Sequence, residues 1–176
     1  GKQGIDELVG QVGALGGDVD ALRTGEWVDP GAAVYARPIG WNVLPLAGSL
    51  TERGYTDEEW KLVHETRKIL ESPEVLVEPA CVRVPVVTGH GIAMTAWFDR
   101  PIGADEAAEL INASPGVEVW VDKIPTPLDS AGRDDVLVGR IRETLGEPGG
   151  ISLWAVGDNL RKGAALNAVQ VAELLI

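Results

Sequence analysis

Two residues that could act together on a substrate lie near the middle of the chain. Arg83 stands inside the apolar run Cys-Val-Arg-Val-Pro-Val, and His90 follows in the turn Thr-Gly-His-Gly. Arginine binds a carboxylate or phosphate through two parallel hydrogen bonds, and histidine is the side chain best suited to proton transfer near neutral pH. Such a pair could hold an anionic carbonyl or acyl substrate and move its proton. The alternative, which these two residues alone favour, is an Arg83 paired with a carboxylate of its own fold and a His90 in solvent.

A second candidate pair, Glu58 and Lys61, is predicted to lie on one face of a helix. Thr56 and Glu59 form a capping-box pattern that starts this helix, and it is expected to run to about Leu70. Residues three apart on a helix face the same way, so the two opposite charges can meet. A solvated ion pair of this kind is worth only ~0.2–0.5 kcal/mol, so it need not signal a function.

The sequence contains none of the common cofactor or metal motifs. It has no G-x-G-x-x-G after a strand, no Walker A sequence, no C-x-x-C pair and no G-x-S-x-G elbow. The two histidines, His64 and His90, are too few and too scattered to predict a zinc site. Cys81 is the only cysteine, and it lies among valines with no base beside it. It is therefore interpreted as a small buried hydrophobic residue rather than a nucleophile.

Hydrophobic periodicity predicts the elements that would position these residues. Helices are expected over 5–15, 56–70, 105–112 and 160–176, and strands over 75–87, 91–98, 117–121, 136–141 and 151–156. The 22 glycines and 11 prolines exceed the average share and predict many turns rather than a helical bundle. Five or six strands, mostly joined as a meander, with four helices packed on one face, give an α+β fold.

The composition excludes several classes of protein. A length of 176 residues is near that of one domain. The net charge of -12 repels a phosphate backbone, so nucleic acid is not an expected partner. A single cysteine fits a reducing compartment and predicts a cytoplasmic protein. No apolar run approaches the ~18–20 residues that span a bilayer, so no membrane association is expected.

The segment Leu-Arg-Lys-Gly-Ala-Ala-Leu-Asn, residues 160–167, is unusual for the start of a helix. A helix dipole favours acidic residues at this end, yet Arg161 and Lys162 stand there. The small residues that follow would permit close approach of another backbone. The segment is either an ordinary packing surface or a contact with a second domain or a cofactor.

Five ordered segments resemble one enzyme family. They are Gly-Trp-Asn-Val-Leu-Pro-Leu-Ala-Gly-Ser, Thr-Asp-Glu-Glu-Trp-Lys with Glu-Thr-Arg-Lys-Ile-Leu, Cys-Val-Arg-Val-Pro-Val with Gly-His, Asp-Val-Leu-Val-Gly-Arg-Ile-Arg, and Gly-Asp-Asn-Leu-Arg-Lys-Gly-Ala-Ala. Together they are similar to aspartate-semialdehyde dehydrogenase and cover nearly the whole chain. The resemblance implies a mixed, largely antiparallel sheet, as in the C-terminal domain of aspartate-semialdehyde and glyceraldehyde-3-phosphate dehydrogenases. Residues 1–157 would form the catalytic, dimer-forming domain, and residues 158–176 a C-terminal helix that packs on an NADP-binding domain.

The resemblance also implies a reaction. Enzymes of this family use NADPH to convert aspartyl 4-phosphate to aspartate 4-semialdehyde and phosphate, on the route to lysine, threonine and methionine. A cysteine forms a thioacyl-enzyme, and a histidine moves the proton. By the matching motifs, His90 would be that acid/base and Arg83 would hold the substrate carboxylate. Glu58 would hold its amino group, Lys61 would contact the phosphate, and Asn159 would face the nicotinamide end of NADP.

The chain also departs from the family pattern. The family's dinucleotide-binding half and its Asn-Cys-Ser/Thr nucleophile are not found in these residues, and Cys81 stands elsewhere. The chain alone, as an excised domain or a truncated relative, is therefore expected to be inactive. A homodimer is what the resemblance to the family implies. The apolar side chains of Leu166, Val169 and Leu174 would lack the domain that they usually contact. Two alternatives stay open: a domain of the N-acetyl-glutamyl-phosphate reductase type, and a non-catalytic dimerisation or interaction module.

Overall fold

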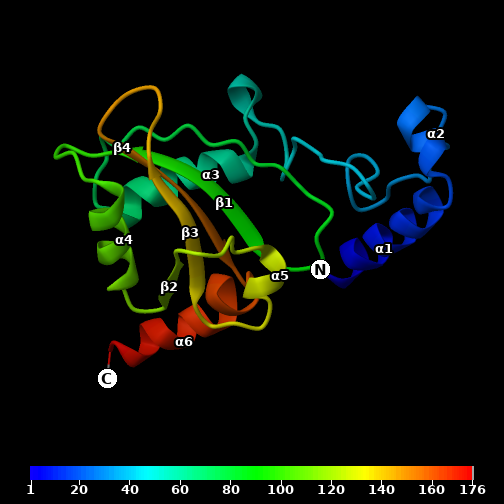
Figure 1. Ribbon diagram of the computed structural model, residues 1–176. Helices are drawn as coiled ribbons and strands as arrows, with labels where there is room; N and C mark the ends of the chain where they lie inside the picture. Colours follow the sequence, from blue (N-terminus) through cyan, green and yellow to red (C-terminus); the bar gives the residue numbers. More distant parts are fainter. Residues whose placement is uncertain (176) are drawn as a thin grey trace. The chain divides into compact units, whose positions relative to one another are not determined.

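The computed structural model describes residues 1–175, and the chain divides into two compact units, Gly1–Val87 and Thr88–Ile176 (Figure 1). Ile176, the last residue of the helix predicted over 160–176, lies outside the described residues. No helix within residues 1–175 is long and apolar enough to cross a membrane.

Helices and irregular segments make up the first unit. α1 turns Leu8 inward, where it meets Ile39 and Leu44 in a small buried core. The capping box predicted for α3 is confirmed, because Thr56 and Glu59 each accept a hydrogen bond from the other's backbone N–H. The helices are α1 (Lys2–Gly16), α2 (Val19–Thr24), the short 3₁₀ turn η1 (Glu52–Gly54) and α3 (Asp57–Ile69).

The strand predicted over 75–87 is wrong, because these residues, all of them described, form an extended and irregular segment. Its sheet-like pairing is a single antiparallel bridge between Arg83 and Leu44. Pro85 has no N–H to donate to a ladder, which disfavours a regular strand here. The alternating valines do not mark a buried sheet face either, since Val84 is 45% exposed.

A mixed sheet forms the second unit. Within the described residues its four strands lie in the order β1-β4-β3-β2. β4 runs antiparallel to β1 and β3, whereas β2 and β3 are parallel, so the predicted α+β class with a mixed, largely antiparallel sheet is confirmed. The predicted count of five or six strands and the meander are wrong, because the parallel pair needs a crossover, which contains α5 (Pro127–Ser130). The strands are β1 (His90–Trp97), β2 (Val117–Trp120), β3 (Val136–Glu143) and β4 (Gly150–Gly157).

Short helices pack against this sheet. α4 (Ala104–Asn112) contacts β2 and β3, and α5 contacts β4 (Figure 1). The core lies where these elements meet the central strands, and Leu137 on β3 and Val156 on β4, which are register partners, are almost fully buried. The ladder between β1 and β4 therefore gives the site residues near its end a rigid support.

The final helix differs from the single α-helix predicted over 160–176. It begins with a π-helical turn (Arg161–Ala165) and continues as α6 (Leu166–Glu173). The wide turn is closed by hydrogen bonds that span five residues, such as Gly163 N–H to the Asp158 carbonyl at 3.2 Å. Such π-type turns often occur at functional sites.

Candidate functional site

Glu58 and Lys61 lie together on α3, as their spacing predicts. Lys61 Nζ is 3.3 Å from Glu58 Oε2, and both side chains are about half exposed. An exposed pair of this kind contributes little to stability, so either charge can leave its partner for a ligand at small cost. The geometry therefore fits both a solvated ion pair and a pair of ligand contacts.

Glu59, between them, ties α3 to the segment that carries Arg83. Its carboxylate accepts hydrogen bonds from the Cys81 N–H at 2.9 Å and from the Thr56 N–H at 2.8 Å. These two backbone donors, that of Cys81 first, hold the pKa of Glu59 below its ordinary value. The capping-box pattern predicted the bond to Thr56, but no sequence signal pointed to the bond with Cys81.

Arg83 is an exposed arginine with a fixed backbone, and its charge has no ion-pair partner among residues 1–175. Its N–H donates to the Leu44 carbonyl at 2.8 Å, and its carbonyl accepts from the Leu44 N–H at 3.0 Å. Its guanidinium lies over the Tyr35 ring, 5.9 Å from the ring centre. Among residues 1–175 it takes part in no ion pair, so the pairing with a carboxylate of its own fold that the alternative expected is not found there, whereas His90 is exposed, as that alternative expected.

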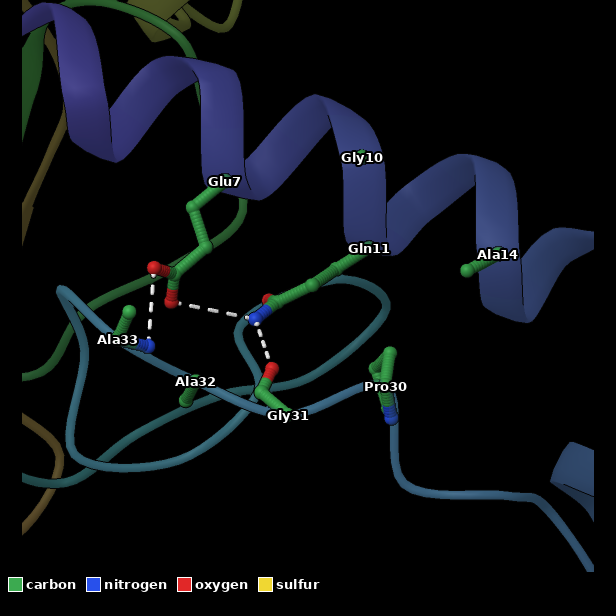
Figure 2. Close-up of a pocket in the computed structure, with 8 residues that line it drawn as sticks. All are labelled: Glu7, Gly10, Gln11, Ala14, Pro30, Gly31, Ala32 and Ala33. Atoms are coloured by element: carbon green, nitrogen blue, oxygen red, sulfur yellow. Dashed lines mark hydrogen bonds between the residues drawn. The ribbon is translucent and has the colours of Figure 1, made fainter.

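The loop that carries Tyr35 is held by two side chains of α1. Figure 2 shows Glu7 and Gln11 reaching from the helix to residues 30–33. The Glu7 carboxylate accepts from three consecutive backbone N–H groups, those of residues 33–35, and Gln11 Oε1 accepts from those of residues 39 and 40. These side chains line a groove of about 420 Å³, but their polar atoms already bond the chain's own backbone, so the groove is part of the scaffold.

Cys81 has the surroundings of a structural cysteine. Burial first, and then the negative charges of Glu59 and Glu58, raise the pKa of its thiol above the ordinary value. A raised pKa leaves the thiol protonated at neutral pH, and only the thiolate is a strong nucleophile. The sequence-based interpretation of Cys81 as a small hydrophobic residue is consistent with this environment.

His90 and Asn159 lie together at one end of the β1–β4 ladder. His90 opens β1 rather than sitting in the preceding turn, and it is the register partner of Gly157. The turn before it is fixed by Gly89, whose φ of 86° is a left-handed conformation that glycine adopts most readily. Gly89 N–H donates to Asn159 Oδ1 at 3.0 Å, which connects the two predicted site residues.

Asp158 holds the Asn159 backbone in place and was missed by the sequence analysis. It is 6% exposed and accepts hydrogen bonds from the N–H groups of Gly132 and Leu160, each at 2.8 Å, and of Arg161 at 3.1 Å. These backbone donors, that of Gly132 first, hold the pKa of Asp158 below its ordinary value. The carboxylate thus starts the π-helical turn that the sequence marked as unusual.

A small cavity of about 250 Å³ opens beside these residues. Its polar lining includes His90, Asp158, Asn159 and Lys162, and apolar side chains of the sheet form its floor. Lys162 Nζ is held at 2.7 Å by Gln170 Oε1 on α6, which leaves its charge without an ion-pair partner among the described residues. The cavity combines a proton-transfer group, an amide and a cation.

The predicted site residues therefore form two groups. Glu58, Lys61 and Arg83 belong to the first unit, where Glu59 connects their segments. His90 and Asn159 belong to the second unit and share one cavity.

Comparison with known proteins identifies the family of the chain. Residues 1–162 match the protein family described as semialdehyde dehydrogenase, dimerisation domain. The chain therefore belongs to the dimerisation-domain family of semialdehyde dehydrogenases.

Curated relatives narrow the class of protein to aspartate-semialdehyde dehydrogenases, which confirms the resemblance carried by the five segments. The chain is 52% identical to the enzyme of Streptomyces akiyoshiensis over 99% of its length, and 48% identical to that of Corynebacterium glutamicum over 100%. Each alignment covers 52% of the relative, so the chain spans about half the length of the curated relatives it matches.

Solved structures show the same relation. Aspartate semialdehyde dehydrogenase II from Vibrio cholerae, in a crystal structure complexed with ASA, matches 99% of this chain and 50% of its own with a TM-score of 0.88 at 41% identity. Aspartate semialdehyde dehydrogenase with NADP from Candida albicans matches 81% of this chain and 46% of its own with a TM-score of 0.62 at 25% identity.

Proposed function

We propose that this chain supplies the substrate side of an NADP-dependent aspartate-semialdehyde dehydrogenase, which converts aspartyl 4-phosphate to aspartate 4-semialdehyde and phosphate. The structural observation that carries the proposal is Arg83: an exposed guanidinium with an anchored backbone and no ion pair among the described residues. An arginine presented in this way is suited to hold a carboxylate through two hydrogen bonds.

The remaining charges match the other groups of this substrate. Aspartyl phosphate carries a carboxylate, an ammonium group and a phosphate, which call for a cation, an anion and a second cation. In the proposal Arg83 takes the carboxylate, Glu58 the ammonium group and Lys61 the phosphate. The exposed Glu58–Lys61 pair opens at little cost when the substrate offers each charge a new partner.

His90 is the proposed acid/base, and Asn159 the proposed contact to the nicotinamide end of NADP. Asn159 Oδ1 is fixed by the Gly89 N–H, and in the described part of the chain its amide NH₂ has no hydrogen-bond partner, so it can donate to a ligand. A cavity of about 250 Å³ beside it fits a group of the size of one aromatic ring and its amide. NADPH, when bound, would supply the hydride, while His90 holds or releases the proton beside it.

The nucleophile and most of the NADP site are proposed to come from residues outside this sequence. Cys81 is the only cysteine here, and the pKa of its thiol is raised rather than lowered. A thioacyl intermediate needs an activated cysteine, so the 176 residues by themselves are expected to show no dehydrogenase activity.

The proposed assembly is a cytoplasmic homodimer, with residues 1–157 as the catalytic and dimer-forming part. Exposed apolar side chains on β1, including Ile92 and Met94 at 55% and 47% exposure, support an interface on the sheet. Residues 158–176 are proposed to pack on the nucleotide-binding domain, which Val169 and Leu174, both exposed in the described residues, support.

The proposed function is tested on the native gene product. Its intact mass and its NADP-dependent activity on aspartate semialdehyde and phosphate would be measured first. A product of about twice 18.6 kDa with that activity is expected. A native product of 18.6 kDa without activity would contradict the enzyme and favour a dimerisation module, and activity on N-acetyl-glutamyl substrates alone would favour the related reductase.

A further inference from the structure

We propose that Tyr35 is a positioning residue that holds the Arg83 guanidinium ready for the substrate carboxylate. The inference rests on the proposed function, in which Arg83 binds that carboxylate, and it adds a residue that neither the motifs nor the charges suggested. Arg83, Tyr35 and the residues that hold them all belong to the first unit.

The Tyr35 ring is fixed at both ends by α1. Its hydroxyl donates to the Gly4 carbonyl at 3.1 Å, and its backbone N–H donates to Glu7 Oε1 at 3.4 Å. Gly4 leaves the room that this arrangement needs, because a Cβ atom there would lie 2.9 Å from the Tyr35 hydroxyl oxygen. The ring also packs on the core formed by Leu8, Ile39 and Leu44.

The same core fixes the Arg83 backbone, since Leu44 pairs with Arg83 through two backbone hydrogen bonds. The backbone pairing leaves the long Arg83 side chain free to rotate, and no ion pair among residues 1–175 restrains it. The Tyr35 ring, whose centre lies 5.9 Å from the guanidinium carbon, restrains the Arg83 side chain instead. Ordering a free arginine on binding costs affinity, and an arginine that is already ordered avoids that cost.

Contact with an aromatic face suits this role better than an ion pair would. A cation over a ring is attracted to the ring face, while the N–H donors of a guanidinium point outward along its edges. The edges therefore stay available for a carboxylate, whereas a carboxylate partner from the protein would have occupied them. Tyr35 thus orders Arg83 without competing for its hydrogen bonds.

The test is steady-state kinetics of the native gene product with aspartate semialdehyde, phosphate and NADP. Tyr35→Leu removes the ring and is expected to raise KM for aspartate semialdehyde about threefold to tenfold, with KM for phosphate and kcat within about twofold. Tyr35→Phe keeps the ring face and is expected to restore most of the lost affinity. This split between two KM values would not follow from a general loss of structure.

Trp41→Leu is the matched control. Trp41 lies in the same loop and its Nε1 donates to the Val12 carbonyl of α1 at 3.1 Å, so this variant also loses a ring and a bond to α1. In the described residues Trp41 makes no cation–π contact with Arg83. Its melting temperature is expected to fall while KM for aspartate semialdehyde stays unchanged; an equal rise of that KM in both variants overturns the inference.

Two further variants test the positioning role if Tyr35→Leu does not fold, and test the role of Arg83 separately. Gly4→Ala should displace the Tyr35 hydroxyl and raise the same KM, and combining it with Tyr35→Phe should reverse the effect even if Tyr35→Leu does not fold. Arg83→Lys tests the underlying function. If Arg83→Lys raises KM and the Tyr35 and Gly4 variants do not, the positioning role alone is overturned; if Arg83→Lys leaves KM unchanged, the carboxylate role of Arg83 fails and the inference with it.

Discussion

Around Arg83, side chains of one helix hold a loop by its backbone N–H groups, whereas around His90 two paired strands hold each other. In the first region Glu7 and Gln11 accept five backbone hydrogen bonds from residues 33–40. In the second, His90 to Trp97 pair without interruption with Gly157 to Gly150. The loop therefore depends on two particular side chains, while the ladder depends mainly on backbone geometry and on space between strands.

The largest effect is expected from Gln11→Leu, which would break the loop. Gln11 is 4% exposed, and its Oε1 accepts from the N–H groups of Ile39 at 2.7 Å and Gly40 at 3.1 Å. Each buried donor left without a partner costs ~1–3 kcal/mol, so the loss of two should lower the free energy of unfolding by about 2–6 kcal/mol. Urea unfolding of the native gene product measures this. Gln3→Leu, on an exposed position of the same helix, should change it by less than about 0.5 kcal/mol.

Gly139→Ala should be a damaging small change in the sheet region. A Cβ atom on Gly139 would lie 2.5 Å from Pro125 Cδ, so β3 or the segment beside it must move. Overpacking of this kind costs about 1–3 kcal/mol. Hydrogen exchange should show lost protection in β3 and β4 with α1 unchanged. Gly146→Ala is the control, because a Cβ atom there would meet no described atom within 4 Å. Equal losses of protection in both variants would contradict the claim that close packing beside Gly139 causes the effect.

Trp154→Phe should have a smaller effect, and it tests the difference between the loop around Arg83 and the strands around His90. Trp154 Nε1 donates to the Pro125 carbonyl at 2.8 Å, the one side-chain bond that this residue adds to the ladder. Its loss leaves one group of the buried Pro125, the carbonyl, without this partner and should cost ~1–3 kcal/mol, about half of the loss in Gln11→Leu, which leaves two donors. In Trp97→Phe the bond lost is exposed and 3.4 Å long, so the melting temperature should hardly change. A loss in Trp154→Phe as large as that in Gln11→Leu would remove the difference between the two regions.

The smallest effect is expected in the pH dependence of stability, through the Glu7 carboxylate that holds the loop. Partial burial raises the pKa of Glu7, but the N–H groups of Val34, Ala33 and Tyr35 together outweigh it, so the pKa lies below its ordinary value. A folded-state pKa below the unfolded value gives stability that is complete above the unfolded pKa of about 4.3 and is lost as the pH falls through the folded pKa. Glu7→Gln should therefore flatten the acid side of a stability–pH curve, measured by unfolding between about pH 3 and pH 6. An unchanged curve would mean that the carboxylate does not hold the loop.

Local signals in the sequence predicted the parts of the molecule that local contacts build. The capping box of Thr56 and Glu59 placed the start of α3, and the three-residue spacing of Glu58 and Lys61 placed them side by side. The four strands of the sheet were found from their alternation, although the extra strand over 75–87 was not. There the valines alternate as in a strand, but Pro85 and the lack of a regular partner prevent one.

Contacts between distant residues were not predictable in this way. Nothing near Glu7 indicates that it binds backbone groups 26 to 28 residues later, and nothing near Tyr35 indicates a ring beneath Arg83. Asp158 was passed over for its neighbour Asn159, because a buried carboxylate that bonds three backbone N–H groups looks in the sequence like any surface aspartate. The candidate site residues themselves came from the resemblance, and their roles stay predictions.

The pairing of β1 with β4 has a consequence for how the chain is made. His90 meets Gly157, so the first strand of the sheet is synthesised long before the last one, its only neighbour in the described sheet. At about 5–20 residues per second, β1 waits several seconds on the ribosome with both edges open. During that interval its apolar side chains and unpaired backbone are open to wrong partners, and the turn before His90 gains its bond to Asn159 only after Gly157 has been made.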